Sequence, residues 1–294
     1  MKLGRRSIIV VTALVLLAIV AVGAVYGFTR DGDHFPRYPG RIAVRDGCGL
    51  RHMFFNGDDP KTMCLPDVWA AVSVSRNGKR LAWDTGHGIE IANADGFNPS
   101  TAPAPPGANF DPSLSPDAKK MACLHSSRDD GRYDLWVGST SIDNAEQLTN
   151  TRNVSTVAWS PAGDWIAYVQ GWSEATLEGD IVLVRPDGSG GHVLTRGDAP
   201  TWAPDGSRLA FVHAGSIWTI RADGSDAQVV VKDGDSPAWS RDGKLIAFTR
   251  EVPCGQPDCQ ERVFLVGATG GKVTGVGPTF AGPRSPVWLP DPFE

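Results

Sequence analysis

The sequence has few of the residues that build metal or redox sites: of 294 residues, 5 are cysteine and 6 are histidine. There is no C-x-x-C pair and the histidines are scattered, which disfavours a zinc site. The nucleophile elbow G-x-S-x-G, the metalloprotease motif H-E-x-x-H and the phosphate-binding P-loop are also absent. We therefore predict a protein that is not an enzyme of these classes and that has no metal or other cofactor.

Basic residues are fewer than acidic ones, with 28 Lys and Arg against 33 Asp and Glu, which gives a net charge of −5. The first 30 residues contain four basic residues and no acidic one, so the remainder has a net charge of −9. An acidic domain repels the phosphate backbone, so nucleic acid is not predicted as a partner. Solubility is the simplest role of this charge.

The N-terminal residues have the pattern of an export segment. Basic residues at the start of the chain precede an apolar run from Ile8 to Phe28, and Asp31 and Asp33 follow it. About 20 apolar residues in a helix span the hydrocarbon core of a bilayer. By the positive-inside rule, everything after this run lies outside the cytoplasm. We expect residues 1–28 to form a single-pass transmembrane signal-anchor in the cell membrane and residues 29–40 to form a linker.

A cleaved signal peptide is the alternative, which would give a secreted protein. Val22-Gly23-Ala24 offers the small residues that signal cleavage requires, although the apolar run is longer than a typical signal core. No cysteine follows the run closely, so a lipid-modified N-terminal cysteine is not supported. Both alternatives predict export from the cytoplasm.

The cysteines suit an oxidising compartment, where disulfides form and persist. Cys48 and Cys64 bracket one predicted hairpin, and Cys254 and Cys259 flank a short loop, so these pairs are disulfide candidates. Cys123 is left over within an apolar segment, and we expect it to be an inert core residue.

Glycine (34 residues) and proline (22 residues) are abundant, and a repeat contains many of them. The three best copies are residues 157–168, 200–211 and 237–248, and weaker copies begin at Ser73 and Ser113. Equivalent positions are spaced by 37 to 49 residues, and a period near 43 is typical of a four-stranded propeller blade. These positions are Val74, Leu114, Trp159, Trp202, Trp239 and Trp288.

Each repeat predicts a short inner strand, an Asp-Gly or Asn-Gly turn, two further strands and an outer strand such as residues 192–195. The segment Ser285–Pro290 matches an inner strand, and residues 41–44 and 49–55 match later strands of a blade. We expect these two ends of the sequence to pair and complete a sixth blade, because a closed ring has no free sheet edges. The predicted fold class is an all-β, six-bladed propeller over residues 41–294.

The repeats resemble the TolB-type propeller repeat (PD40, WD40-like), whose core is W-S-P-D-G-x-x-I-A-F. The closest matches begin at Trp159, Trp202 and Trp239, and the likeness covers about residues 40–291. The Gly-His and Trp-Asp signatures of true WD40 repeats are absent. In this family, TolB is a periplasmic protein that binds a peptidoglycan-associated lipoprotein through one face of its propeller.

That resemblance implies a propeller that binds a cell-envelope protein. The sequence differs from TolB because it shows no α/β domain before the propeller and has the predicted anchor. The specific Tol-system role is therefore not carried over. The alternative is a propeller hydrolase or lyase with a metal or polar site at the channel mouth, because propeller hydrolases gather metal ligands from separate blades.

Recognition is expected on the rim opposite the Asp-Gly turns, because the loops there are irregular. Long loops are predicted at residues 125–133, 170–180 and 250–262, and Trp172 in the second is a candidate exposed anchor. The tryptophans of the inner strands are instead expected to pack between blades. Charged residues that enter the inner strands could hold a cation, a basic peptide or a polar ligand, although each Asp could equally cap its own turn. These residues are Asp67, Asp111, Arg152, Asp198, Asp235 and Arg284.

Overall fold

A computed structural model describes most of the predicted propeller. The described residues are 41–46, 49–54, 61–63, 72–85, 88–94, 96, 98–128, 130–141, 144–252, 260–281 and 285–289. Within these ranges the regular structure is all β, and no helix is long and apolar enough to span a membrane. The predicted anchor at residues 1–28 and the linker at 29–40 lie outside the described residues.

The strands form antiparallel sheets, each built largely from consecutive strands. One sheet has the order β23-β1-β2-β3, with β23 (Val287–Leu289), β1 (Arg41–Asp46), β2 (Gly49–Phe54) and β3 (Lys61–Met63). The next contains β4 (Val72–Val74), β5 (Arg80–Thr85), β6 (Gly88–Asn93) and β7 (Ser100–Thr101). A third contains β8 (Ala108–Leu114), β9 (Lys120–Ser126), β10 (Asp134–Ser139) and β11 (Glu146–Gln147).

The remaining strands form a seven-stranded sheet and a four-stranded one. The larger sheet contains β12 (Val154–Trp159), β13 (Ile166–Ser173), β14 (Glu178–Val184), β15 (His192–Trp202), β16 (Arg208–His213), β17 (Ser216–Arg221) and β18 (Gln228–Lys232). The smaller sheet contains β19 (Asp235–Trp239), β20 (Leu245–Val252), β21 (Gln260–Gly267) and β22 (Thr274–Ala281).

Two sequence predictions in this region need correction. The outer strand predicted at residues 192–195 continues into the next inner strand as β15, which pairs with β14 through its first part and with β16 through its second. A glycine at the crossing allows this, because a Cβ at Gly197 would lie 2.6 Å from the Val212 carbonyl oxygen. The long loop predicted at residues 170–180 is a hairpin of β13 and β14 with a short turn at residues 174–177.

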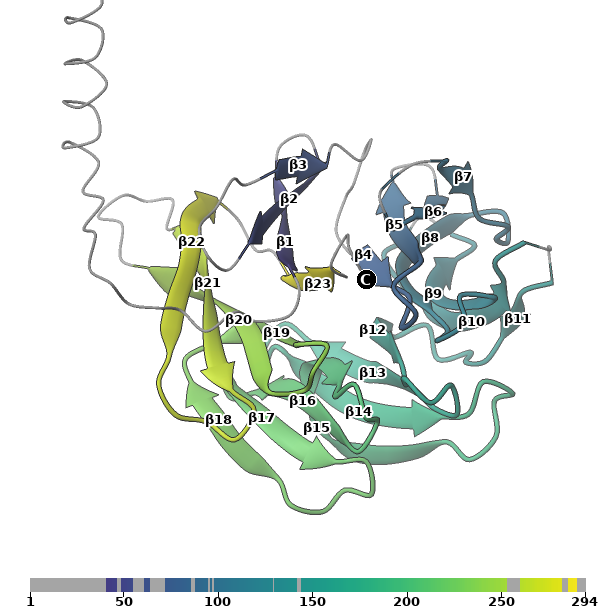
Figure 1. Cartoon of the computed structure of the whole chain (residues 1–294). Helices are drawn as coiled ribbons and strands as arrows, with labels where there is room; N and C mark the ends of the chain where they lie inside the picture. The colour runs from purple at the N-terminus through teal and green to yellow at the C-terminus, as the bar shows by residue number, and fades with distance from the viewer. Residues whose placement is uncertain are drawn as a thin grey trace, which may run out of the picture. The chain divides into compact units, whose positions relative to one another are not determined.

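The sheets surround a common centre, around which strands β23, β4, β12 and β19 lie (Figure 1). Strand β23 pairs with β1, where Trp288 lies opposite Ile42, and it also contacts β19 and β4. The predicted pairing of the last strand with the N-terminal strands is therefore confirmed. This pairing joins the two ends of the propeller sequence in one sheet.

Each sheet is apolar on both faces because it packs against a neighbour on each side. Buried clusters join one repeat to the next: Trp159 packs with Leu135 and Val137 of the preceding sheet, and Trp202 packs with Ile181 and Leu183 of the preceding repeat within the seven-stranded sheet. Indole N–H groups add hydrogen bonds between successive repeats, from Trp202 to the Ala158 carbonyl (3.1 Å) and from Trp288 to the Ala238 carbonyl (3.0 Å). The packing role predicted for the inner-strand tryptophans is confirmed.

The serine that follows the inner strand explains the repeated turn motif. In four of the repeats its buried hydroxyl accepts a bond from the backbone N–H five residues later and donates to a carboxylate or amide oxygen of the turn. In the last of these, Ser240 accepts from Leu245 N (2.9 Å) and donates to Asp242 Oδ1 (2.7 Å). The four serines are Ser75, Ser115, Ser160 and Ser240.

Replacing Ser240 with alanine tests this role. We expect S240A to lose about 1–2 kcal/mol of unfolding free energy, because the N–H of Leu245 loses its acceptor in a buried turn. Urea-induced unfolding followed by tryptophan fluorescence measures the change. The matched control is S225A, which removes an exposed hydroxyl that bonds only to Asp223 in its own turn. An equal loss in both variants would contradict the proposed role.

Candidate functional site

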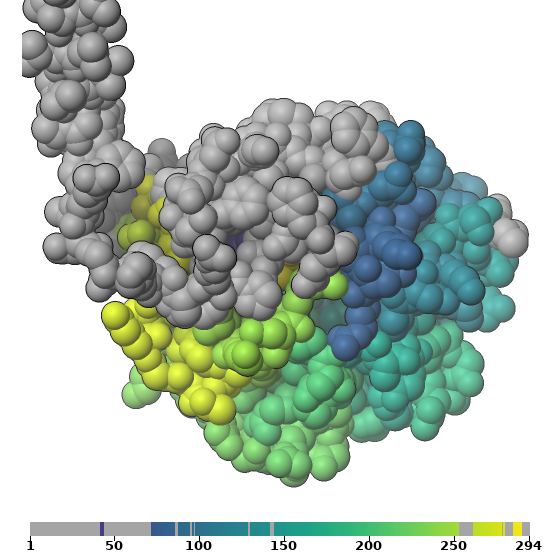
Figure 2. Space-filling view, viewed as in Figure 1, coloured from purple at the N-terminus to yellow at the C-terminus, as the bar shows by residue number. Residues whose placement is uncertain are grey.

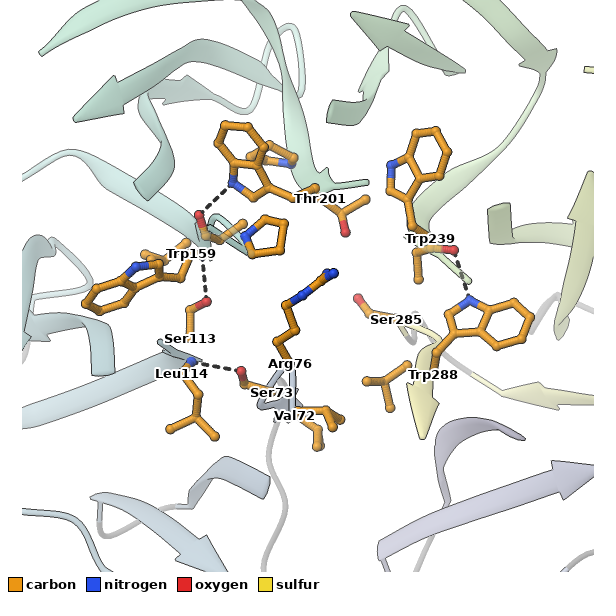
Figure 3. A pocket seen from close by; sticks show the side chains of 18 of the residues that line it. Val72, Ser73, Arg76, Ser113, Leu114, Trp159, Thr201, Trp239, Ser285 and Trp288 are labelled. Atoms are coloured by element: carbon orange, nitrogen blue, oxygen red, sulfur yellow. Dashed lines mark hydrogen bonds between the residues drawn. The ribbon is translucent and has the colours of Figure 1, made fainter. Parts of the chain in front are cut away.

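A channel of about 470 Å³ runs through the centre of the sheets. It is lined by the inner strands β4, β8, β12, β15, β19 and β23 and by the turns that follow several of them. The space-filling view shows a hollow between the blue and green parts of the molecule (Figure 2). In the close view, Arg76, Ser113 and Ser285 face the centre of the channel, whereas the indoles of the lining tryptophans point outward between the sheets (Figure 3). This channel is the candidate functional site.

One end of the channel is shaped by a bulge at the start of four inner strands. Asp111, Thr156, Ala199 and Ser236 have φ angles of 49°, 50°, 48° and 49°, and each lies at a break in the strand register. Such φ values are uncommon for residues other than glycine. The bulge re-aims the side chains next to it, which is a common use of bulges beside functional sites.

The bulges separate residues that the sequence analysis had grouped. Asp198 and Asp235 precede the bulge residue, whereas Asp111 is itself the bulge residue. Asp111 lines the channel, and its carboxylate accepts a bond from Val157 N of the next sheet (2.7 Å). It therefore connects two sheets instead of capping its own turn.

The pKa of Asp111 is raised to about 7, mainly by burial and in smaller part by the nearby carboxylates Asp84 and Asp198, against the lowering effect of the hydrogen bond from Val157 N–H. Asp84 is buried in β5 and was missed by the sequence analysis. The sequence does mark Asp84 as unusual, because it is a charged residue at a strand position where other repeats have the apolar residues Leu124, Val169 and Val212. We call Asp84, Asp111 and Asp198 the acidic end of the channel.

Asp198 is held by three donors from two strands and a neighbouring hairpin. It accepts bonds from Ala199 N (2.7 Å), Trp172 Nε1 (3.1 Å) and Thr156 Oγ1 (3.2 Å). Partial burial raises its pKa against these hydrogen bonds, and the charge of Asp235 adds to the rise. Trp172 is half-buried against the cluster around Trp202, so its indole supports Asp198 instead of projecting as a free anchor.

The other predicted site residues lie apart from the channel lining or outside the described residues. Asp235 is exposed and accepts bonds from the backbone N–H and the hydroxyl of Ser236, as a turn cap does. The Arg152 side chain pairs with Asp130, and its backbone N–H donates to Asp134. Asp67, Arg284 and the disulfide candidates Cys48, Cys64, Cys254 and Cys259 lie outside the described residues. Cys123 is buried, and burial, with a smaller effect of Asp111, raises the pKa of its thiol to about 12.

The opposite end of the channel is basic. Arg76 and Arg241 line it from the turns that follow β4 and β19, and Figure 3 shows Arg76 pointing toward the channel centre. The described lining of the channel therefore has the carboxylate of Asp111 at one end and two guanidinium groups at the other. Among the residues that the structure describes, no three His, Cys, Asp or Glu side chains are grouped closely enough to hold a metal ion.

No protein-family model matches the sequence. Over 104 residues the chain is 27% identical to the uncharacterized protein YidR of Escherichia coli K12. This match covers 32% of the chain and 23% of YidR, so the chain spans less than a quarter of the curated relative.

Solved structures resemble the chain over most of its length. TolB from Acinetobacter baumannii has a TM-score of 0.71 at 18% identity, covering 87% of this chain and 68% of that one. A chain of a nidogen/laminin complex has a TM-score of 0.65 at 13% identity, covering 84% and 97%. An oligogalacturonate lyase in complex with manganese has a TM-score of 0.52 at 13% identity, covering 81% and 74%. The chain thus has the fold of a TolB-type β-propeller, a fold that hosts unrelated functions.

The variant D111N tests the ionisation of the acidic end. The folded-state pKa of Asp111, about 7, lies above its ordinary value of 3.8, so its stabilising contribution is present at low pH and is lost as pH rises through 7. Asparagine keeps the acceptor for Val157 and cannot ionise. We expect D111N to gain about 1–3 kcal/mol of unfolding free energy relative to the parent between pH 4 and pH 8.

The control is D187N, measured in the same urea unfolding series. Hydrogen bonds from the Ser189 hydroxyl and backbone N–H hold the pKa of exposed Asp187 below its usual range. Its charged form therefore stabilises the fold, and D187N should lose stability relative to the parent as pH rises through the acidic range. A pH-independent difference for D111N would rule out a raised pKa at Asp111.

Proposed function

We propose that this chain is an exported, membrane-anchored, six-bladed TolB-like propeller that binds a protein of the cell envelope through its acidic end. The observation that carries the proposal is the channel with Asp111 in its lining and with Asp84 and Asp198 close enough to raise the pKa of Asp111. The similarity of fold to TolB, which extends over 87% of this chain, supports a binding role.

The sheet topology supports the proposed six blades. The seven-stranded sheet counts as two blades, because β15 is the outer strand of one and the inner strand of the next. Together with the four-stranded sheets this gives six blades, including one built from both ends of the propeller sequence. This arrangement supports a ring with no free inner edge.

The proposed partner presents a basic segment. Carboxylates around a channel mouth favour positive charge and steer it toward the mouth. The turn at residues 174–177 lies on the same rim and exposes Leu177, whose side chain is 64% exposed. An exposed leucine beside a charged mouth is the kind of apolar contact that anchors a protein partner.

The second candidate is lyase chemistry at the channel mouth. The structural similarity to a manganese-bound oligogalacturonate lyase suggests this second function, but among the described residues no three His, Cys, Asp or Glu side chains are grouped as metal ligands. We therefore favour binding. If binding is the function, manganese or a chelator should leave partner capture unchanged.

Cross-linking in intact cells tests partner binding. We expect the full-length parent to capture one envelope protein reproducibly, and L177D to capture at least about tenfold less, because a central apolar contact is lost and negative charge is added. Quantitative mass spectrometry of the cross-linked fraction measures the capture.

The matched control is V193D, which changes an equally exposed apolar residue on the outer part of β15. Its capture should equal that of the parent. Equal capture by all three proteins would refute binding through this rim.

The proposed anchor has a separate test. We expect the full chain to stay in the membrane pellet after alkaline carbonate extraction with an N-terminus that retains residues 1–28, because about 20 apolar residues span a bilayer. Propeller epitopes should be digested by protease added to spheroplasts. A soluble product that begins just after Ala24 would show instead that the segment is a cleaved signal peptide.

A further inference from the structure

At the end of the channel formed by the turns, five repeats each contribute the residue that directly follows the recurring turn serine or, in one repeat, the alanine that replaces this serine. Three repeats place proline there, at Pro116, Pro161 and Pro204. Two place arginine there, Arg76 and Arg241. All five residues line the channel.

The prolines have a packing role. Each lies against the turn glycine of the next repeat: a Cβ at Gly163 would lie 3.5 Å from Pro116, and one at Gly243 would lie 3.2 Å from Pro204. Where Arg76 replaces proline, the next turn has Ala118 in place of that glycine, at a φ of 59°. The proline–glycine contact is thus absent between these two turns, and the presence of Arg76 is not explained by this packing role.

The two arginines instead bring positive charge to the channel. The Arg76 guanidinium crosses the ring and donates to the Pro204 carbonyl, and Arg241 Nη2 donates to the Arg76 carbonyl (3.1 Å). Within the described ranges, neither side chain forms an ion pair with a carboxylate. Arg76 acts on the carboxylate of Asp205 only weakly, because the pKa of Asp205 is lowered first by the Ser207 N–H and in smaller part by Arg76.

We propose that Arg76 and Arg241 form a binding site for an oxyanion, the carboxylate or phosphate group of a small ligand that occupies the channel. A guanidinium has five N–H donors. The guanidinium groups of Arg76 and Arg241 each donate one hydrogen bond to a backbone carbonyl, so further N–H groups remain to bind an oxyanion. A cavity of about 470 Å³ is in the size range of small-molecule sites. The carboxylates at the far end repel an anion and so favour its retention at the arginines.

Isothermal titration of the full chain, kept in detergent at low ionic strength, tests this site with inorganic phosphate and with succinate. We expect saturable binding of at least one probe by the parent. In R76P/R241P, which restores the residue found in the other repeats, we expect the dissociation constant to rise at least about tenfold because two charge-assisted donors are lost. R76A/R241A serves as a second variant should the prolines disturb the turns.

The control R128A/R132A removes the same charge from two exposed side chains in the loop after β9 and should bind as the parent does. Binding of phosphate alone identifies a phosphate ligand, and binding of succinate alone identifies a carboxylate. No saturable binding of either probe by the parent would overturn the proposal. Equal affinity in parent and folded arginine variants, or equal loss in the control, would also overturn it.

Discussion

The structure depends on the burial of both faces of every sheet. A sheet that is apolar on both sides is stable only with a neighbour on each side, and a ring provides this for every member. The antiparallel pairing of β23 with β1 closes the ring, because it places Trp288 beside Ile42 and brings β23 into contact with both β19 and β4. Without that pairing, the apolar faces of the first and last sheets would be exposed.

Ring closure also creates the channel and its polarity. Short inner strands converge on the centre, and bulges at Asp111, Thr156, Ala199 and Ser236 orient the residues at one end. Burial, and in smaller part the charges of Asp84 and Asp198, raises the pKa of Asp111 to about 7, so this carboxyl is near half-ionised at neutral pH. At the other end, arginines take positions that prolines fill elsewhere. A channel with opposite charge at its two ends would orient any dipolar or charged occupant.

Much of the fold could be predicted because the signals are local and repeated. The Asp-Gly turns, the inner-strand tryptophans and the serine that caps four of the turns recur at nearly constant spacing, and each has a local physical cause. The candidate site was harder to predict. Asp111 and Asp198 were both predicted only as charged residues that enter an inner strand, but the bulge separates their roles. Trp172 was expected to project from a loop, but its indole bonds to Asp198 because residues 170–173 continue β13.

The sequence by itself determined the blade repeat, the inter-sheet packing of the tryptophans and the pairing of the two ends of the propeller sequence. These follow from hydrophobic pattern and turn chemistry, which act between residues close in the chain or at a fixed period. The tertiary structure alone decided which charged residues meet. Asp84, Asp111 and Asp198 come from different strands, as Arg76 and Arg241 come from different turns, and only the closed ring brings each group together. Electrostatic coupling depends on distance through space and on burial, and neither is encoded at any single position of the repeat.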